Sequence, residues 1–132
     1  MGTFSGRYCL RPIAYRTYEY TPDEGAPFAF VTDLGQRIQP DTMLTDGAST
    51  PRAIWIVPGF DPMDWIDGAV IHDWLYECNH RGLSSVTFEQ ANAVLSECLQ
   101  SLGVAHWKRA AIMAAVGAFG RAVWNRKIFG GE

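Results

Sequence analysis

Hydrophobic and polar positions along the chain follow two different periods, and the change between them falls near Asp61. Before that point, short segments rich in Tyr, Ile, Phe and Val alternate roughly between apolar and polar residues, and turn residues separate them. Such alternation predicts β-strands with one buried face. We expect strands over residues 8–13, 14–20, 28–31 and 35–39.

After that point, apolar residues recur every three or four positions, which is typical of amphipathic helices. An Asp-Pro pair favours a helix start, and the first helix is expected over residues 62–78. Thr87 and Gln90 form a capping-box pattern, which predicts a second helix that ends at Gly103. A third helix is expected over residues 105–126, where many Ala and Gly residues favour close helix packing.

The two patterns together predict an α+β fold, with a small N-terminal antiparallel sheet packed against a C-terminal three-helix unit. A chain of 132 residues has the usual size of one domain. We therefore expect a single domain over residues 1–132, with a strand and loop half over 1–60 and a helical half over 61–132. Four tryptophans are expected in the core: Trp55, Trp65, Trp74 and Trp107.

Composition and charge narrow the classes of partner. A net charge of -3 and a pI near 5.5 give no global attraction to nucleic acid. The longest apolar run, over residues 110–120, is well short of the roughly 20 residues that span a bilayer. The first residues also lack the apolar core of a signal peptide. We therefore expect a soluble protein without a transmembrane segment and without a nucleic-acid partner.

The cysteines number three, and none has the Cys-x-x-Cys spacing. This count supports neither a full disulfide framework nor a zinc knuckle. Reduced thiols are expected, and a bridge between Cys78 and Cys98 on two helices is the alternative.

An ionisable pair, His72 and Asp73, lies inside the apolar segment 69–76, which is expected to be a buried part of a helix. Burying an imidazole and a carboxylate is costly unless each finds a partner. Helical spacing places Tyr76 on the face of His72, while Asp73 points about 100° away. The pair therefore indicates either a catalytic or metal site or a polar network that fixes the helix.

An upstream polar cluster with Asp46, Ser49 and Arg52 offers partners and admits three chemistries. In the first, His72 is a general base, while Asp46 and Asp73 bind Ca²⁺ or another divalent cation that stabilises an oxyanion. In the second, Ser49 is a nucleophile activated by His72, although the Gly-x-Ser-x-Gly elbow is absent. In the third, His72 joins the carboxylates as a ligand of a transition metal.

A purely structural interpretation accounts for the same residues. His72 would then donate to a backbone carbonyl, and Asp73 would pair with Arg52 or cap a loop. Tyr76 would be an ordinary core aromatic residue. The two other histidines, His80 and His106, are expected in loops or at helix ends.

Two motifs, Thr-Asp-Gly-Ala-Ser-Thr-Pro-Arg over residues 45–52 and His-Asp-Trp-Leu-Tyr over residues 72–76, resemble the DUF1353 family. The likeness extends from about Ile38 to Trp124. The resemblance implies a small protein of uncharacterised activity, encoded by a bacteriophage or prophage. It also implies that seven residues stand at the family's motif positions: Asp46, Ser49, Pro51, Arg52, His72, Asp73 and Tyr76.

One position departs from the family pattern, which usually has Ala-Asp near the start of the second long helix. This chain has Ala91 and Asn92 there. If the family's acid orients the histidine, Asn92 can still form a hydrogen bond but cannot stabilise an imidazolium as a carboxylate does.

The motif His-Asp-x-x-Tyr on a long helix, facing a second helix, is also similar to the active-site helices of phospholipase A2. In those enzymes the histidine activates water and the adjacent aspartate binds Ca²⁺. The analogous roles here would fall to His72, Asp73 and Asn92. The disulfides and the glycine-rich calcium loop of those enzymes are missing, so the likeness is an analogy only.

The leading expectation is a metal-assisted or histidine-based hydrolase that acts on a cell-envelope component, either peptidoglycan or lipid. His72, Asp73, Ser49 and Asn92 would be catalytic, Arg52 and Tyr76 would bind substrate, and Asp46 and Asp73 would bind metal. The alternative is a non-enzymatic virion or tail accessory protein that contacts other virion or tail proteins. A third option is a small protein that binds a host factor in the infected cytoplasm. The protein would be found in the host cytoplasm or in the virion.

Overall fold

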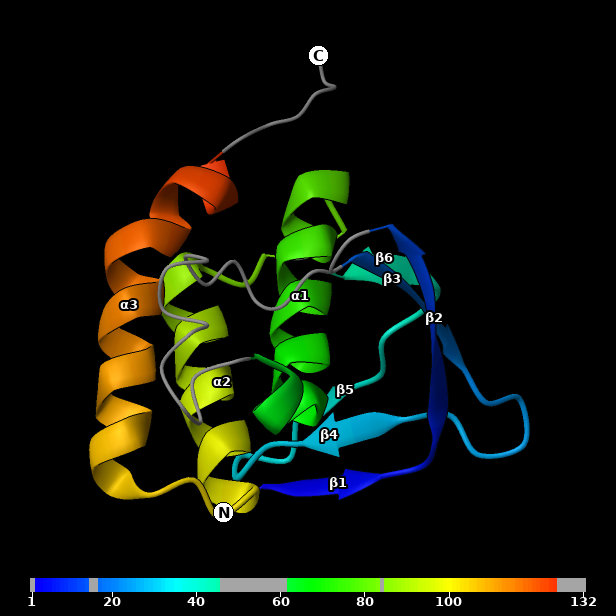
Figure 1. The fold of residues 1–132 in the computed structure, drawn as a ribbon, viewed down its shortest axis with the longest axis horizontal. Coiled ribbons are helices and arrows are strands. Elements are labelled where there is room, and N and C mark those ends of the chain that lie inside the picture. The colour runs from blue at the N-terminus through cyan, green and yellow to red at the C-terminus, as the bar shows by residue number, and fades with distance from the viewer. Residues whose placement is uncertain (1, 15–16, 46–61, 84, 126–132) are drawn as a thin grey trace.

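A computed structural model describes residues 2–14, 17–45, 62–83 and 85–125 of the chain. These residues form an α+β arrangement, with three helices side by side and two small antiparallel sheets along one flank (Figure 1). The predicted fold class is confirmed, but the one sheet expected is divided into two. Four residues with expected roles fall outside the described residues: Asp46, Ser49, Arg52 and Trp55.

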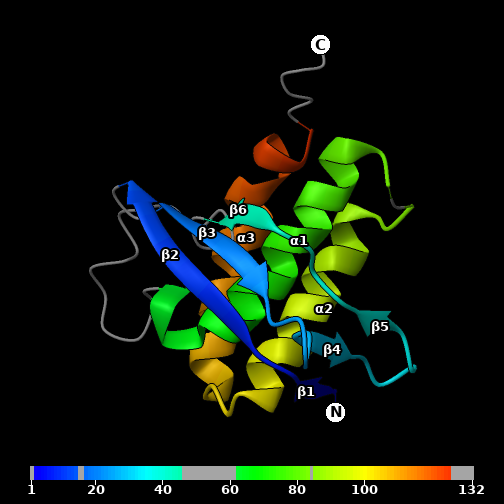
Figure 2. The same cartoon turned by 90° about the vertical axis from the view of Figure 1, so that its right-hand side faces the viewer.

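The strands pair in two three-stranded sheets, with the orders β1-β4-β5 and β2-β3-β6 (Figure 2). Every pairing within them is antiparallel. The strands are β1 Thr3–Ser5, β2 Tyr8–Ala14, β3 Thr17–Pro22, β4 Ala29–Val31, β5 Arg37–Ile38 and β6 Met43–Thr45. Four of them overlap predicted strands. The other two, β1 and β6, were not predicted, because neither lies within a longer apolar run as the equally short β4 does.

Gly6 carries the chain from one sheet into the other. Its backbone φ is 78°, a left-handed conformation that side chains rarely adopt. A Cβ atom at this position would also overlap the carbonyl oxygen of Pro27. Glycine is therefore required at the corner between β1 and β2.

The helical half begins with a short 3₁₀ helix, η2 (Pro62–Trp65), which leads into α1 (Ile66–Arg81). The first helix therefore runs three residues past its predicted end. It ends at Gly82, whose φ of 71° closes the last turn. None of the described helices has the length and apolar character needed to cross a membrane.

The predicted capping box opens α2 (Phe88–Ser101). The hydroxyl of Thr87 accepts a hydrogen bond from the Gln90 backbone N–H at 3.0 Å, and the Gln90 side chain accepts one from the Thr87 N–H at 2.9 Å. The third helix, α3 (His106–Asn125), lies within one residue of its predicted bounds at each end.

The core fills the space between the sheets and α1 and the space between the three helices. Trp65 is buried as predicted, and Trp74 packs partly buried against the core. The expectation for Trp107 is wrong, because its side chain is 64% exposed. Nine residues along a helix rotate by about 180°, so Trp107 points away from the buried face that carries Val116.

Candidate functional site

His72 lies at the middle of α1 and is fully buried, with 0% of its surface exposed. Its Nε2 atom lies 2.8 Å from Oδ1 of Asn92 on α2. An amide oxygen can only accept, so Nε2 carries the ring proton and donates it. The structure thus brings together the histidine and the residue expected to orient it, and the partner is a side chain rather than a backbone carbonyl.

The other ring nitrogen, Nδ1, is buried and has no hydrogen-bond partner among the described residues. Because Nε2 holds the proton, Nδ1 presents a lone pair. Burial lowers the pKa of His72 to about 4, although the hydrogen bond to Asn92 acts in the opposite direction. The imidazole is therefore neutral at neutral pH, with a free acceptor on one side.

Tyr76 stacks one helical turn along α1, with its ring centroid 4.7 Å from that of His72. Its ring also meets Trp124 of α3 edge-on at 5.0 Å. The phenol oxygen is buried and has no hydrogen-bond partner in the part of the chain that is described. Burial, with a smaller contribution from Asp73, raises the pKa of Tyr76 above its usual range, so the phenol stays protonated.

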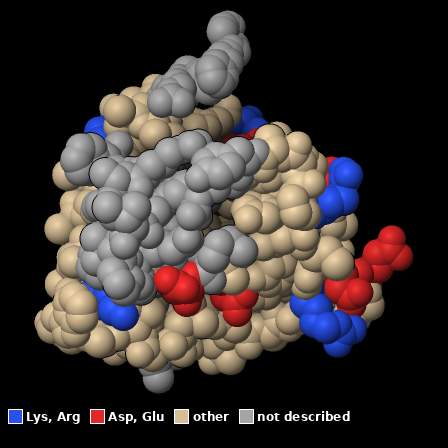
Figure 3. Space-filling model, viewed as in Figure 1, with Lys and Arg blue, Asp and Glu red and all other residues tan. Residues whose placement is uncertain are grey.

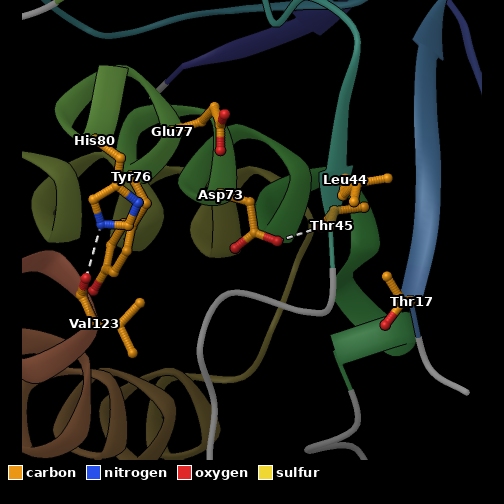
Figure 4. Close-up of a pocket in the computed structure, with 8 residues that line it drawn as sticks. All are labelled: Thr17, Leu44, Thr45, Asp73, Tyr76, Glu77, His80 and Val123. Atoms are coloured by element: carbon orange, nitrogen blue, oxygen red, sulfur yellow. Dashed lines mark hydrogen bonds between the residues drawn. The ribbon is translucent and has the colours of Figure 1, made fainter. Parts of the chain in front are cut away.

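Asp73 points away from His72, as the helical spacing predicted. Its carboxylate is half-buried and accepts a hydrogen bond from the hydroxyl of Thr45 at the end of β6 (Figure 4). This bond joins α1 to the second sheet. The side chain of Asp73 faces a pocket, whereas His72 lies behind the pocket wall.

The pocket has a volume of about 190 Å³ and lies between α1, β6 and the end of α3. Figure 4 shows its walls, with Tyr76 and His80 on one side and Leu44, Thr45 and Thr17 on the other. A carbonyl oxygen can only accept, so Nε2 of His80 carries the proton and donates to the carbonyl of Val123 at 2.8 Å. The full lining is Thr17, Leu44, Thr45, Asp73, Tyr76, Glu77, His80 and Val123.

The electrostatics of the pocket are set by two carboxylates one turn apart on α1, Asp73 and Glu77. Glu77 is paired with Arg81 at 2.7 Å, and Asp73 with the Thr45 hydroxyl. On the face of the molecule shown in Figure 3, acidic and basic side chains lie in small separate groups rather than in one broad field of a single sign.

The structure leaves part of the predicted site untested. Ser49, Arg52 and Asp46 lie outside the described residues, so of the two expected metal ligands only Asp73 can be placed. Within the described ranges, no three His, Cys, Asp or Glu side chains gather closely enough to hold a metal ion. All three cysteines are free, so the thiols are reduced as expected and no Cys78–Cys98 bridge is present.

Several pocket residues were not singled out from the sequence. Glu77 and His80 follow Asp73 at four and seven residues, which places them on one helix face, so that spacing could have identified them. Thr45 and Val123 come from β6 and α3. Their approach to α1 depends on tertiary packing and leaves no local signal.

Comparison with protein families gives one match. The model of a family described as "Protein of unknown function (DUF1353)" matches residues 25–116, which is more than half of the chain. The matched range runs from before β4 to the middle of α3, and it includes His72, Asp73, Tyr76 and Asn92. Comparison with curated proteins and comparison with solved structures found no match.

Proposed function

The chain belongs to the DUF1353 family, and from this premise we propose that it is a hydrolase in which His72 acts as general base. In this proposal the protein is encoded by a phage or prophage. It cleaves an ester or amide in a cell-envelope component, either peptidoglycan or lipid. The observation that carries the proposal is the state of the imidazole, which is neutral, oriented by Asn92 and unpaired at Nδ1 among the described residues.

A general base needs a lone pair directed at the proton it removes, in a ring that cannot rotate. The bond from Nε2 to Asn92 fixes both the tautomer and the orientation of the His72 ring. Nδ1 would then take a proton from a water molecule as that water attacks the scissile carbonyl. The imidazolium would return this proton to the leaving oxygen or nitrogen as its bond to the carbonyl carbon breaks. Because Asn92 carries no charge, the imidazolium formed in this step receives less stabilisation than it would from a carboxylate.

The pocket lined by Asp73 and Tyr76 would hold the scissile group. Its volume of about 190 Å³ is smaller than the roughly 300–1,000 Å³ of pockets that enclose a whole small ligand. It is suited to one end of a larger molecule whose remainder lies outside, as for a lipid or a peptidoglycan strand. Tyr76 separates the pocket from His72, so the reaction requires a displacement that lets substrate or water reach Nδ1.

The step proposed here uses His72 and water, and Asp46, which was expected to bind a divalent cation together with Asp73, lies outside the described residues. The companion measurement is the melting temperature in the presence and absence of Ca²⁺ and Zn²⁺. A rise in the melting temperature with one of these ions would indicate that the protein binds that ion.

The test compares the wild-type protein with His72→Gln on two substrates, purified peptidoglycan and phospholipid vesicles. Gln keeps a side-chain amide that can donate to Asn92, whereas Ala would leave a cavity in the core. Loss of a general base is expected to lower the rate by roughly 10²–10⁴-fold. The control, measured on peptidoglycan, is His106→Gln, since His106 is exposed at the start of α3 and far along the chain from the pocket. Equal rates for wild type and His72→Gln would refute the proposal.

The second candidate function, a non-enzymatic virion or tail accessory protein, is favoured by one observation. His72 is fully buried and its hydrogen bond ties α1 to α2, as a scaffold residue would. In that case neither substrate would be cleaved by the wild-type protein, and His72→Gln would change only stability. Co-purification of the protein with phage particles would then support the accessory role.

A further inference from the structure

The turn between α2 and α3 presents two large apolar side chains to solvent. Leu102, at the end of α2, is 36% exposed, and Trp107, in the first turn of α3, is 64% exposed. This turn lies at the lower end of the helices in Figure 1, the end at which α1 begins. Of the large apolar side chains that are exposed among the described residues, these two share one turn between helices.

Two cationic residues, Lys108 and Arg109, follow Trp107 in the first turn of α3. Lys108 places its ammonium 5.6 Å from the centre of the Trp107 ring. The Arg109 guanidinium donates to the carbonyl of Val104 at 3.4 Å and lies 3.2 Å from Nδ1 of His106, so it is held against the turn.

Negative charge is absent from this part of the sequence, because residues 98–125 contain no Asp or Glu although the whole chain has a net charge of -3. The elements that begin the helical half do carry acids, Asp64 in the first turn of η2 and Asp67 in the first turn of α1, so the positive charge is confined to the turn between α2 and α3. The turn is thus a small basic and apolar patch on an acidic protein.

We propose that this turn is a reversible anchor for an anionic lipid surface. Trp107 and Leu102 would enter the headgroup region, where an amphipathic indole is stable, and Lys108 and Arg109 would face lipid phosphates. A second copy of the chain fits this patch less well, since pairing two such turns would bring their like charges together. The anchor does not depend on the reaction proposed at His72.

The test is co-sedimentation with vesicles of phosphatidylcholine alone and of phosphatidylcholine with phosphatidylglycerol in a three-to-one ratio. The wild-type protein is expected to bind the anionic vesicles preferentially and to release them as salt rises. Trp107→Ala should weaken binding roughly tenfold, since a large apolar side chain no longer enters the bilayer surface. Lys108→Gln should weaken it roughly fivefold.

The matched control is Leu83→Ala, because Leu83 is also exposed (63%) but follows α1 at the opposite end of the helices. It should bind as tightly as the wild type. The fold of Trp107→Ala is checked by its far-ultraviolet circular dichroism spectrum, which should match that of the wild type.

Three results would overturn the anchor. One is no binding of the wild-type protein to anionic vesicles, and another is equal binding by wild type and Trp107→Ala. The third is a wild-type dimer in sedimentation velocity that Trp107→Ala converts to a monomer without any vesicle binding. This last result would assign the patch to a second copy of the chain.

Discussion

Among single residues, His72 shows most clearly how burial and hydrogen bonding set a protonation state. A charged imidazole would be costly in a fully buried position, and the nearest partner, Asn92, is neutral. The ring is therefore neutral and makes one hydrogen bond where it could make two. A buried polar atom without a partner costs about 1–3 kcal/mol. Such a cost indicates either a role for Nδ1 or a partner from outside the described residues.

The low pKa of His72 predicts a loss of stability in mild acid. The pKa is about 4 in the folded protein and near the ordinary value of 6.5 in the unfolded chain. Between these values the unfolded chain binds a proton that the folded protein does not. Stability therefore falls as pH decreases from 6.5 to about 4, by at most about 3 kcal/mol from this residue. The loss is complete below the folded pKa and absent above pH 6.5.

Urea denaturation near pH 7 and near pH 4.5 checks this expectation. His72→Gln removes the titrating group and keeps an amide beside Asn92, so its loss of stability between the two pH values should be smaller than that of the wild type. Other titrating groups contribute equally to both proteins and cancel in the comparison. An identical loss in the two proteins would mean that His72 titrates normally.

Asn92→Asp tests the electrostatic role of the amide. A carboxylate at 2.8 Å from Nε2 would favour the imidazolium and should raise the pKa of His72 by at least about one unit. The measurement is an NMR titration of the imidazole resonances. If His72 is the base of a hydrolase, the same variant should also cleave substrate faster than the wild type. A pKa that stays near 4 would show that burial outweighs the new charge.

The sequence predicted the placement of a residue where local helical spacing determines it, and not where a contact between two helices does. Helical spacing alone correctly separated the faces of His72 and Asp73. Asn92 was identified only through the family resemblance, because a contact between two helices leaves no trace in local periodicity. Trp107 was assigned to the core on its residue type, although its position on the helix opposes the buried face.

Among the elements, α1 connects the two halves of the protein and α3 closes over it. Gly120 allows α3 to approach α1 closely, because a Cβ atom at this position would overlap the hydroxyl of Tyr76. Tyr76 cannot easily move aside, because its ring packs against His72, Trp124 and Phe88. A small residue is therefore required where α3 crosses Tyr76.

Gly120→Ala and Gly117→Ala form a matched pair on the same helix. Ala is favoured over Gly in a helix by about 1 kcal/mol, and Gly117 has open space around it, so Gly117→Ala should stabilise the protein by up to that amount. Gly120→Ala should instead lower stability by about 1–3 kcal/mol through overpacking. Urea denaturation measures both changes.

Tyr76→Phe identifies which contact destabilises Gly120→Ala. In Tyr76→Phe the hydroxyl is absent, so adding Gly120→Ala to that background should cost much less than it does in the wild type. An equal cost in both backgrounds would mean that the clash is with Phe88 or with the helix backbone.

The elements also show which structural signals are local. The capping box at Thr87 and Gln90 fixed the start of α2 correctly, since all of its hydrogen bonds lie within four residues. The sheets were harder to predict. β1 pairs with β4, and β3 pairs with β6, so the partners are separated by more than twenty residues. Pairing at such separations is decided by the packed core, and one sheet could not be told from two.

At the scale of the whole molecule, hydrogen bonds attach the N-terminal half to the helices at several points besides the Thr45–Asp73 bond. The phenol of Tyr8 on β2 donates to Asp67 of α1 at 2.5 Å. The Ser101 hydroxyl donates to the carbonyl of Gly2 at 2.7 Å, and the Asp33 N–H donates to Glu97 at 2.9 Å. The Tyr8 ring also packs against the core shared by both halves. These contacts favour the single-domain organisation predicted from chain length.

A shared core implies that sheets and helices unfold together, and Tyr8→Phe tests this. Losing a hydrogen bond to a half-buried carboxylate should cost roughly 1–2 kcal/mol, and the midpoints of sheet and helix unfolding should fall together. In a Trp55→Phe background, the remaining tryptophans all lie in the helical half, so their fluorescence reports that half. Hydrogen exchange of the β3 amides reports the sheet. Arg7→Gln is the control, since it removes only a surface ion pair with Asp23 and should change stability little. Sheet amides that exchange before the fluorescence changes would instead show that the N-terminal half unfolds on its own, as a unit merely docked on the helices.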